Sequence, residues 1–545
     1  MFNLALRSAL TLVVLFGILF AVITAVLVYL QAPVWLAVIV VLVIAGLQYA
    51  ISPYIIEWIY DIQWQPPEHV DQGIATLIRQ VCHNQGLREP KFGVIEDGNP
   101  NAFTFGHYPS DARLVITRGI LDLCDEEERR AVVAHELGHI VHWDFVVMTV
   151  AATVPLVLYY IFRFGIYGRS RRDKGGGAIV LVALAAFVAY IVSQYIVMFL
   201  SRLREYYADQ YSGQTTANPN ALATALVKIA YGLARNPTER EDEETGRLQP
   251  VAAAAGGAKM LGIFDRDFGA SLALAAGGSD AVIATTDRRT VERALAWDLF
   301  NPWATICEIN STHPLPARRL RALERQARKL GQLPVYDLPD KGAESYWDEF
   351  FVDLLMNYLP IIGLIGGIAG ALVIGAGGQI GAAVGAAILG LGVGLLGRTL
   401  FAYPKYGFTA TRVADLVSEI KISRIRSIPA VLKGRIIGRG IPGLYWSEDL
   451  VLQDESGFIP LDYRQPLGIF ELLFGLFRAE SFIGQQVTVE GWYRRYPRPY
   501  LELWKLHSPD GTTQTSHNWA VAFWGSLALT VVGIVVLAGG LLLAA

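Results

Sequence analysis

The segment that decides the fold reads AVVAHELGHIVHWD at residues 131–144. The apolar run Val146–Ile166, which is long enough to cross a bilayer, follows it directly. His135 and His139 are four residues apart in this segment. On a helix that spacing separates them by only about 40° around the axis, so both imidazoles can reach one point. The segment therefore predicts a helix that presents two histidines from one face.

The H-E-x-x-H pattern within this segment indicates a site for one zinc ion. The two histidines would supply neutral nitrogen ligands, and Glu136 between them would act as general base on a zinc-bound water. Zn²⁺ lowers the pKa of such a water toward about 7. Asp125, with Glu128 three residues later, fits the capping box that begins a helix. Because the same short pattern also arises by chance in long chains, a surface helix carrying two histidines is the alternative.

A catalytic zinc needs a third protein ligand and an open fourth position. The candidate is Glu205, in the segment SRLREYYAD at residues 201–209. Taken alone, Glu205 reads as a surface carboxylate paired with Arg202 or Arg204. Asp209, one turn further along the same face, has two interpretations. It would either accept the second ring N–H of a ligating histidine, as a second-shell residue, or pair with a cation four residues away.

The apolar runs between the two motifs favour Glu205 as the third ligand. We expect the helix of His139 to continue without a break into Val146–Ile166, which would place His139 roughly 10 Å along the axis from the start of that span. Glu205 follows the next apolar run, Ala178–Leu200, by roughly 8 Å of helix. Two adjacent antiparallel spans would therefore raise the histidines and Glu205 to nearly the same height above the bilayer.

The composition of the 545 residues is that of an integral membrane protein. Hydrophobic residues make up 53% and charged residues 17%, whereas soluble domains have roughly 45–50% and about 25%. This balance excludes a disordered chain, a disulfide scaffold and a collagen-like repeat. With a net charge of −3 there is no basic excess, and we expect no nucleic-acid partner. Three widely spaced cysteines are expected to be reduced thiols: Cys82, Cys124 and Cys307.

Alternating apolar and polar segments predict the domain organisation. The expected parts are an N-terminal transmembrane hairpin at 1–52, a zinc peptidase domain at 53–349 with two transmembrane helices (146–166 and 178–200), a Gly-rich transmembrane hairpin at 350–402, a soluble β domain at 403–518 and a C-terminal transmembrane helix at 519–545. Within the peptidase domain, the acidic and then Ala-rich segment 236–257 is expected to be a flexible loop.

The C-terminal third of the chain contains two further patterns. The Gly-rich stretch 359–397 allows two spans, or one tilted span with a re-entrant piece, and its small-xxx-small pairs would let helix backbones approach closely; these are Gly363/Gly367, Gly366/Gly370 and Gly381/Gly385. Residues 403–518 hold short β-branched and aromatic stretches between Gly, Asp and Pro turns, which predicts a small barrel of the OB type. Arg494, Arg495 and Arg498 lie among aromatic residues. Arginines among aromatic residues are also found on barrel faces that bind nucleic acid. Because this domain is tethered between membrane spans, a solvated face or a contact with lipid headgroups or protein is favoured.

Several motifs together resemble the HtpX-type membrane zinc endopeptidases, which are relatives of the CAAX prenyl endopeptidases. The motifs are HELGH followed by Asp144, SRLREYYAD, NAFTFG at 101–106, ITRGILDLCDEEERRAVVAHELGH at 116–139 and STHPLPARRL at 311–320. They occur in the family's order, and the resemblance covers roughly residues 1–330. The resemblance implies a mainly α, zincin-like (gluzincin) peptidase domain with a small edge sheet. It also matches His135, His139 and Glu205 to the family's zinc ligands and Glu136 to its base.

The resemblance implies roles for a second group of residues. Asn101 and Ala102 match the edge strand beside the family's cleft, which could hold an extended substrate by main-chain pairing. His313 matches a segment that serves transition-state stabilisation or site closure, and a purely structural role is the alternative. Arg319 matches an arginine whose role is expected to be structural. The chain departs from the family pattern at Leu315, where a second proline usually follows the histidine.

The sequence as a whole predicts a multi-pass cell-membrane zinc metalloendopeptidase that acts on membrane-associated or misfolded membrane proteins. The alternatives are a processing peptidase of the CAAX type and a catalytically inactive membrane scaffold whose β domain binds partners. The resemblance, Arg7 and the pair Arg202/Arg204 favour a cytoplasmic active site, whereas the cations of 168–177 favour the opposite orientation by the positive-inside rule. The substrates and the oligomeric state are left open.

Overall fold

The computed structural model describes residues 2–30, 34–167, 176–235, 288–376, 379–439, 449–496 and 498–543. Contacts between residues divide the chain into two compact units. The first unit comprises Met1–Leu233, Ala253–Gly269 and Ile306–Asp337, and the second comprises Ala234–Ala252, Ala270–Thr305 and Leu338–Ala545. The predicted flexible loop at 236–257 and most of the cationic segment 168–177 lie outside the described residues.

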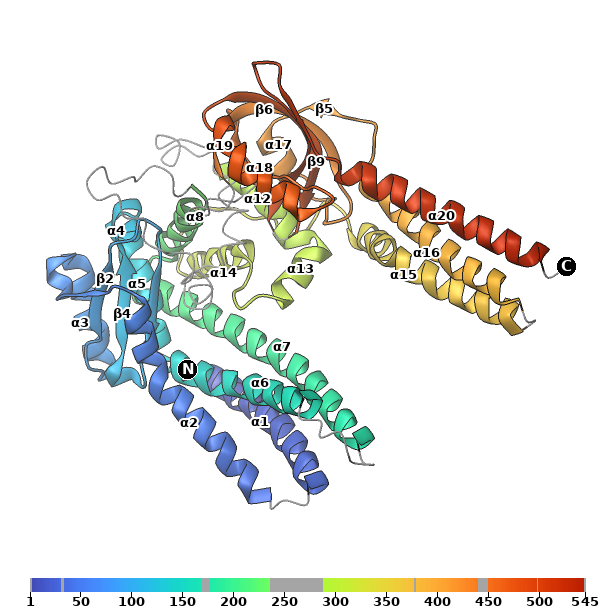
Figure 1. Cartoon of the computed structure of the whole chain (residues 1–545). Coiled ribbons are helices and arrows are strands. Elements are labelled where there is room, and N and C mark those ends of the chain that lie inside the picture. The colour runs from blue at the N-terminus through green and yellow to red at the C-terminus, as the bar shows by residue number, and fades with distance from the viewer. Residues whose placement is uncertain are drawn as a thin grey trace. The chain divides into compact units, whose positions relative to one another are not determined.

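Long apolar helices form one part of the first unit (Figure 1). α6 (Asp144–Tyr167) and α7 (Gly176–Thr215) pack side by side, α1 (Phe2–Leu30) packs against both, and α2 (Val34–Ile59) contacts α1 and α6. The 40 residues of α7 span about 60 Å. Since a bilayer core is about 30 Å thick, the helix extends well beyond it. The helix is therefore long enough for its C-terminal part, which carries Glu205, to project beyond the hydrocarbon.

Six helices of the described chain are long and apolar enough to cross a bilayer. Their candidate spans are Leu6–Ile23, Asp144–Arg163, Val180–Thr215, Trp347–Gly375, Ile380–Ala402 and Asn518–Leu542. The multi-spanning α-helical architecture predicted from the sequence is confirmed. The run expected as the second arm of the N-terminal hairpin forms α2, a helix of 26 residues that is not among these six. A hairpin that crosses the membrane at 1–52 therefore stays a prediction.

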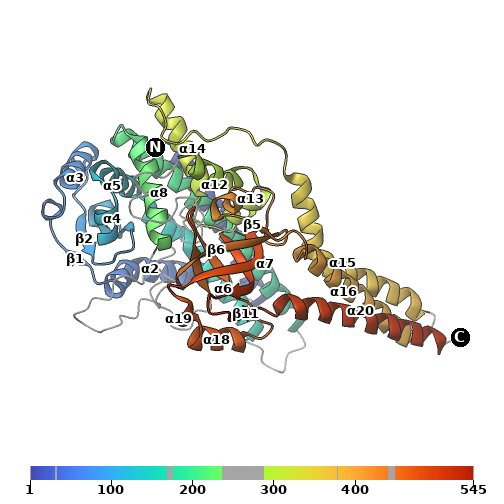
Figure 2. The same ribbon diagram turned by 90° about the horizontal axis from the view of Figure 1, so that it is seen from above.

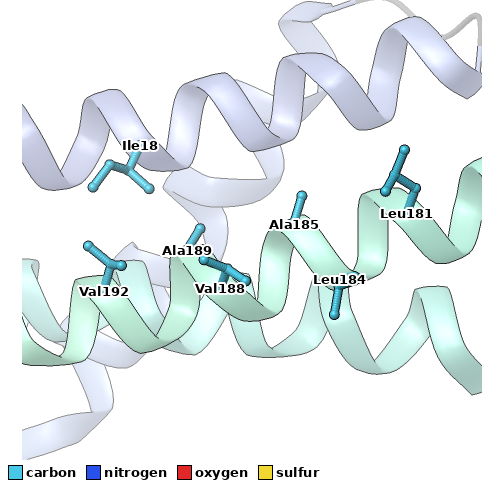
Figure 3. Close-up of a pocket in the computed structure, with 7 residues that line it drawn as sticks. All are labelled: Ile18, Leu181, Leu184, Ala185, Val188, Ala189 and Val192. Carbon is cyan, nitrogen blue, oxygen red and sulfur yellow. The ribbon is translucent and has the colours of Figure 1, made fainter. Parts of the chain in front are cut away.

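An open apolar groove lies between α1 and α7 (Figure 3). It has a volume of about 490 Å³ and is lined by Ile18, Leu181, Leu184, Ala185, Val188, Ala189 and Val192. Every lining residue is aliphatic and lies within a membrane-length part of its helix. The groove is therefore a lipid-facing feature of the first unit and contains none of the predicted site residues.

The helix that carries the two histidines ends before the membrane span begins, so the prediction of one continuous helix is wrong. α5 (Glu126–Val141) is followed by Trp143 in a left-handed conformation with φ of 60°, and α6 begins at Asp144. In an unbroken helix, Asp144 would lie about 140° around the axis from His139. The break instead brings the Asp144 carboxylate to within 2.5 Å of His139 Nδ1.

A small sheet completes the first unit. Its strand order is β1-β2-β4-β3, formed by β1 (Gln63–Trp64), β2 (Lys91–Ile95), β3 (Ala102–Phe105) and β4 (Arg113–Thr117). β2 and β4 are parallel, whereas β3 is antiparallel to β4 and forms an edge. α5 packs against β3 and against α3 (Gln72–Gln85). The edge sheet predicted for the peptidase domain is thereby confirmed.

Short helices connect these elements. They are η1 (Pro67–His69), η2 (Pro109–Asp111), α4 (Arg118–Leu123), α8 (Pro219–Arg235) and α14 (Pro316–Lys329), and α13 (Pro302–Ile309) contains a boundary between the two units. α14 packs against α7. The turn before α14 is important for the candidate site because it carries His313.

Three long helices of the second unit run side by side in both views of Figures 1 and 2: α15 (Trp347–Ala376), α16 (Ile380–Ala402) and α20 (Asn518–Leu542). The Gly-rich stretch thus contains two helices, as the two-span alternative expects. Gly363 and Gly390 lie at the contact of α15 with α16, where a Cβ on either would overlap the carbonyl oxygen of the other. The absence of side chains at these two positions permits the close approach.

The predicted small-residue pairs do not all contribute to this packing. Gly367 lies against Ala386 and Ala387 of α16, and Gly385 lies against the backbone of Leu537 in α20. A Cβ at Gly366 or Gly370 would meet no described atom within 4 Å. That pair was wrongly expected at a helix contact, because both glycines lie on a face of α15 that does not meet α16.

The β domain of the second unit contains a closed barrel. β6 (Ile428–Arg439), β7 (Leu450–Gln453), β8 (Phe458–Asp462), β10 (Pro499–His507) and β9 (Gln486–Arg495) pair in that order, and β9 pairs back to β6. Only β8 and β10 are parallel within this ring. Five strands in this Greek-key arrangement are those of an OB fold. The predicted OB-like barrel is confirmed.

Smaller elements surround the barrel. They are β5 (Thr409–Ala410), α17 (Val413–Val417), α18 (Gly468–Phe477), α19 (Ala479–Phe482), β11 (Thr513–Thr515) and α12 (Arg288–Phe300). α12 lies within the range expected for the peptidase domain, yet it packs against α17 and forms hydrogen bonds with the β domain. Trp297 Nε1 donates to the Ile422 carbonyl at 2.9 Å, and Asp298 Oδ1 accepts from Arg495 at 2.9 Å.

For Arg494 and Arg495, the expectation of a solvated or ligand-facing surface is wrong. Arg494 and Arg495 are buried, with exposed fractions of 3% and 0%. Arg494 pairs with Glu502 at 2.8 Å, and Arg495 pairs with Asp298. Because each buried guanidinium has a buried carboxylate partner, both arginines serve the barrel interior and its contact with α12.

Candidate metal and catalytic site

The residues of the H-E-x-x-H pattern all lie on α5. The helix begins with the predicted capping box: Asp125 Oδ1 accepts from Glu128 N at 3.0 Å, and Glu128 Oε2 accepts from Asp125 N at 2.9 Å. Three acidic residues in the first turn further stabilise this end of the helix dipole. Near the other end, Gly138 leaves room for α7, because a Cβ there would lie 3.3 Å from Ala208 Cα. The histidines therefore face α7 at short range.

The structure brings the three predicted zinc ligands together. The two Nε2 atoms of His135 and His139 lie 3.2 Å apart. The Glu205 carboxylate lies 3.6 Å from His135 Nε2 and 3.7 Å from His139 Nε2. Tetrahedral coordination with bonds of 2.0–2.1 Å places neighbouring ligand atoms about 3.3–3.4 Å apart. The three side chains thus fit a zinc ion with only small adjustments.

The electrostatics of the site favour a bound cation. His135, Glu136 and Glu205 are buried, and Glu205 Oε2 accepts no hydrogen bond from the described part of the chain. Burial alone lowers the pKa of His135, but its contacts with the carboxylates of Asp209 and Glu205 outweigh that effect and raise the pKa to about 9. The surroundings of His135 therefore stabilise positive charge beside a buried carboxylate oxygen that accepts no hydrogen bond and lies 3.5 Å from the Arg319 guanidinium.

A carboxylate lies behind each histidine. His135 Nδ1 is 3.0 Å from Asp209 Oδ1, and His139 Nδ1 is 2.5 Å from Asp144 Oδ2. When the Nδ1–H of an imidazole faces a carboxylate, the lone pair is on Nε2 and available to a metal. Asp209 also accepts two hydrogen bonds from Arg319, at 2.6 and 2.9 Å. It therefore contacts both a histidine and a cation, although the cation comes from α14 and not from its own helix.

From the sequence alone, Asp144 has no assigned role at the site, and a surface ion pair with Arg202 or Arg204 is only the alternative for Glu205. Arg204 is buried and pairs with Asp144, while Arg202 donates to the carbonyl oxygens of Glu308 and Ser311 at 2.7 and 2.5 Å. Neither forms the surface ion pair with Glu205 that its position suggested. The position of Asp144 shortly after the second histidine was the available signal, but the helix break that makes it useful was not evident.

His313 lies at the site with Glu205. It is 5% exposed, and its Nε2 is 3.7 Å from Glu205 Oε1. The turn that carries it is held by Glu308, which accepts from Leu315 N at 3.1 Å and pairs with Arg318. The Arg202 contacts described above hold the same turn from α7. His313 is therefore fixed beside the proposed third ligand by residues of α7, α13 and α14.

The edge strand β3 lies beside the general-base candidate. The hydroxyl of Thr104 hydrogen-bonds the carboxylate of Glu136, whose pKa is raised chiefly by burial. Ala102 begins β3, and the carbonyl of Asn101 accepts from Thr117 N at 2.9 Å. Because hydrogen-bonded and non-hydrogen-bonded pairs alternate in an antiparallel ladder, the main-chain groups of Ala102 and Thr104 point away from β4. They face an edge that pairs with no strand of the described chain.

Comparison with known proteins assigns the N-terminal half of the chain to a protein family. Residues 68–327 match the family model described as Peptidase family M48. A "Protease HtpX homolog" of Methanothermobacter thermautotrophicus is 40% identical over 247 residues, which cover 45% of this chain and 92% of the relative. A "Protease HtpX homolog" of Aeropyrum pernix is 32% identical over 298 residues, which cover 53% and 85%. These relatives match nearly whole, whereas about half of this chain has no counterpart in them.

A solved structure shows a weaker likeness. The chain is similar to "Crystal Structure of S. mikatae Ste24p", with 19% identity and a TM-score of 0.29, over 42% of this chain and 60% of that chain. A TM-score this low supports no argument about fold or activity. The assignment of the chain therefore rests on its sequence relatives and the family model.

Proposed function

The chain belongs to peptidase family M48, as an HtpX-type membrane protease, and from this premise we propose that it is a zinc metalloendopeptidase. The observation that carries the proposal is the convergence of two imidazoles and one carboxylate at 3.2–3.7 Å. His135, His139 and Glu205 would hold one zinc ion. When bound, zinc would polarise the scissile carbonyl and lower the pKa of a water molecule toward about 7.

Glu136 would move the proton in this reaction. Its carboxylate would accept a proton from the attacking water and deliver it to the leaving amine. Burial raises the pKa of Glu136, which brings a carboxylate closer to the operating pH and suits both steps. His313, fixed 3.7 Å from Glu205, would donate a hydrogen bond to the developing oxyanion. Asp209 and Asp144 would hold the two imidazoles in the orientation that zinc requires.

The substrate would bind as an extended strand. The outward-facing main-chain groups of Ala102 and Thr104 could pair with a peptide beside β3, with Asn101 at the start of this edge. Thr104 also contacts Glu136, so a paired peptide would pass close to the base. Main-chain pairing recognises no particular side chain, and it requires the bound segment of the substrate to be unfolded. This supports membrane-associated or misfolded membrane proteins as the substrate class.

The test uses the full chain in proteoliposomes with fluorescently labelled, unfolded casein as the probe. We expect about one zinc per chain by elemental analysis, and a chelator should abolish cleavage until zinc is restored. Glu136→Gln should retain zinc and lose cleavage by about 100- to 10,000-fold, the usual contribution of a general base. Glu127→Gln, at an exposed position in the first turn of the same helix, is the matched control. Wild-type cleavage by Glu136→Gln would refute the assigned role.

We further propose that the site lies on the cytoplasmic side of the cell membrane. Ser8 Oγ accepts from Arg204 at 2.7 Å, so Arg7 lies at the same end of the spans as the site and counts as a positive charge on that side. The cations Arg169, Arg171, Arg172 and Lys174 favour the opposite orientation. A thiol at Glu127→Cys should react with a membrane-impermeant maleimide only after permeabilisation. Labelling of intact cells would reverse the proposed topology.

A further inference from the structure

An apolar helix on the β domain has its large side chains exposed. α18 has the sequence GIFELLFGLF and connects β8 to the following short helix. Phe474 is buried at 4% exposure and contacts the Tyr463 ring, with centroids 4.2 Å apart. The remaining large apolar side chains on the helix and just before it are between 39% and 76% exposed: Leu467, Ile469, Phe470, Leu472, Leu473, Leu476 and Phe477. One residue therefore anchors α18 to the barrel while most of its apolar surface faces outward.

Hydrogen bonds tie both ends of α18 to the segment that leads into a membrane span. Before the helix, Gln465 donates to the Thr515 carbonyl at 3.0 Å and accepts from His517 N at 3.2 Å. After the helix, Arg478 donates to Gln514 Oε1 at 3.2 Å. The span α20 begins at Asn518. Since an extended residue covers at most about 3.6 Å, all these anchors lie within roughly 14 Å of the start of the span.

The start of α20 has the features of a membrane surface. Trp519, Phe523 and Trp524 lie in its first two turns, and the Lys405 ammonium stands 4.1 Å from the Trp519 ring centroid. Tryptophan and flanking cations concentrate where a span crosses the headgroup region. α18 is therefore held at about the height of the headgroups. Its 10 residues cover only about 15 Å, which is too short to cross the bilayer.

We propose that α18 is an interfacial membrane helix that inserts its exposed apolar side chains into the same bilayer that α20 crosses. Length, apolarity and attachment all point to the lipid surface: a short apolar helix can lie in the plane of the interface but cannot span it. The exposed Arg478 after the helix would remain among the headgroups. The insertion fixes one side of the barrel on the membrane and does not depend on the proposed zinc site.

The test places a fluorescent probe on α18 of the full chain in phosphatidylcholine vesicles. The native cysteines are Cys82, Cys124 and Cys307, and all three are buried, so a cysteine added at Phe470 or Phe477 can be labelled with bimane selectively. We expect phospholipids brominated on the upper acyl chain to quench both probes and aqueous iodide to leave them unquenched. The circular dichroism spectrum and the elution volume on gel filtration confirm that each labelled protein is folded.

The matched control is Lys433→Cys, an exposed position on β6. Ser427, just before β6, contacts the Ala402 carbonyl at the end of α16, and Lys433 lies about 20 Å of strand further on. Its probe should be quenched by iodide and not by the brominated lipids. Quenching of both α18 probes by iodide would overturn the proposal. Protection from both quenchers would also overturn it, because the helix would then be covered by protein.

Discussion

Each histidine of α5 is held by its own series of buried charges. His135 contacts Asp209, which is paired with Arg319. His139 contacts Asp144, which is paired in the same way with Arg204. The two aspartates and the two arginines come from α6, α7 and α14, yet they place a carboxylate beside the Nδ1 atom of each imidazole. Because both Nδ1 atoms face carboxylates, each imidazole in its neutral form would keep the Nε2 lone pair available to a metal.

These carboxylates should control metal affinity. We expect Asp144→Asn and Asp209→Asn each to weaken zinc binding about 10- to 100-fold, as loss of a carboxylate behind a ligating histidine usually does. Competition with a fluorescent zinc chelator measures the affinity. Asp61→Asn, at an exposed aspartate of the same unit, should leave it unchanged. Unchanged affinity in both site variants would show that the aspartates do not orient the imidazoles.

At the scale of elements, glycines determine how closely α15 and α16 approach. Gly363 and Gly390 bring the two backbones together, whereas Gly366 lies on the open face of the same α15 helix. Leucine at Gly363 would overlap a backbone atom that cannot move independently. Leucine at Gly366 would meet open space.

Substitution at the contact should therefore destabilise the second unit selectively. We expect Gly363→Leu to lower the free energy of unfolding by about 1–3 kcal/mol or more through overpacking. Gly366→Leu should have little effect, since it adds the same side chain to the same helix away from the contact. Thermal unfolding in detergent, followed by circular dichroism, measures the difference. Equal stability of the two variants would contradict the glycine-dependent packing.

A second contact between elements is the buried ion pair that attaches α12 to the barrel. Arg495 and Asp298 are 0% and 1% exposed and form their ion pair at 2.9 Å. We expect Arg495→Met to cost about 3–5 kcal/mol of stability, because it leaves a buried carboxylate without its partner. The double variant with Asp298→Leu should recover most of this loss, as measured by the same unfolding experiment. No recovery would show that the pair is not coupled.

The division into two units shows which part of the chain can be removed without removing the candidate metal site. His135, His139, Glu205 and His313 all belong to the first unit. α12 belongs to the second unit although it precedes His313 in the chain. The HtpX homolog of M. thermautotrophicus is covered over 92% of its length by 45% of this chain. A chain that ends at Asp337 can therefore keep the candidate metal site, but it leaves α12 without the barrel.

A truncated chain of residues 1–337 should separate these two properties. We expect it to bind zinc, because every proposed ligand is present. Its α12 segment should become sensitive to added trypsin, because Trp297 and Asp298 lose the contacts that bury them. Zinc analysis and limited proteolysis followed by mass spectrometry measure the two outcomes. Loss of zinc binding in a folded truncated chain would show that the metal site requires the second unit.

Much of the molecule could be predicted because the relevant physics is local. The helix period alone places His135 and His139 on one face, and the Asp125 capping box acts within one turn. The membrane helices follow from the length of an apolar run relative to the bilayer thickness. Strand-forming stretches with turn residues between them were sufficient to predict a small barrel. The close approach of Glu205 was also inferred, because two antiparallel spans constrain the height of the helix turns adjoining them.

The sequence by itself thus determined the two histidines on one helix face, the membrane-spanning helices and the β composition of the C-terminal domain, because each depends on neighbours in the chain or on the fixed thickness of a bilayer. Only the tertiary structure decided which charges are buried together. Asp144 reaches His139 through a break in the helix, and Arg495 meets Asp298 across 197 positions of sequence. A buried charge is stable only beside its partner, and chain folding, not sequence spacing, selects that partner.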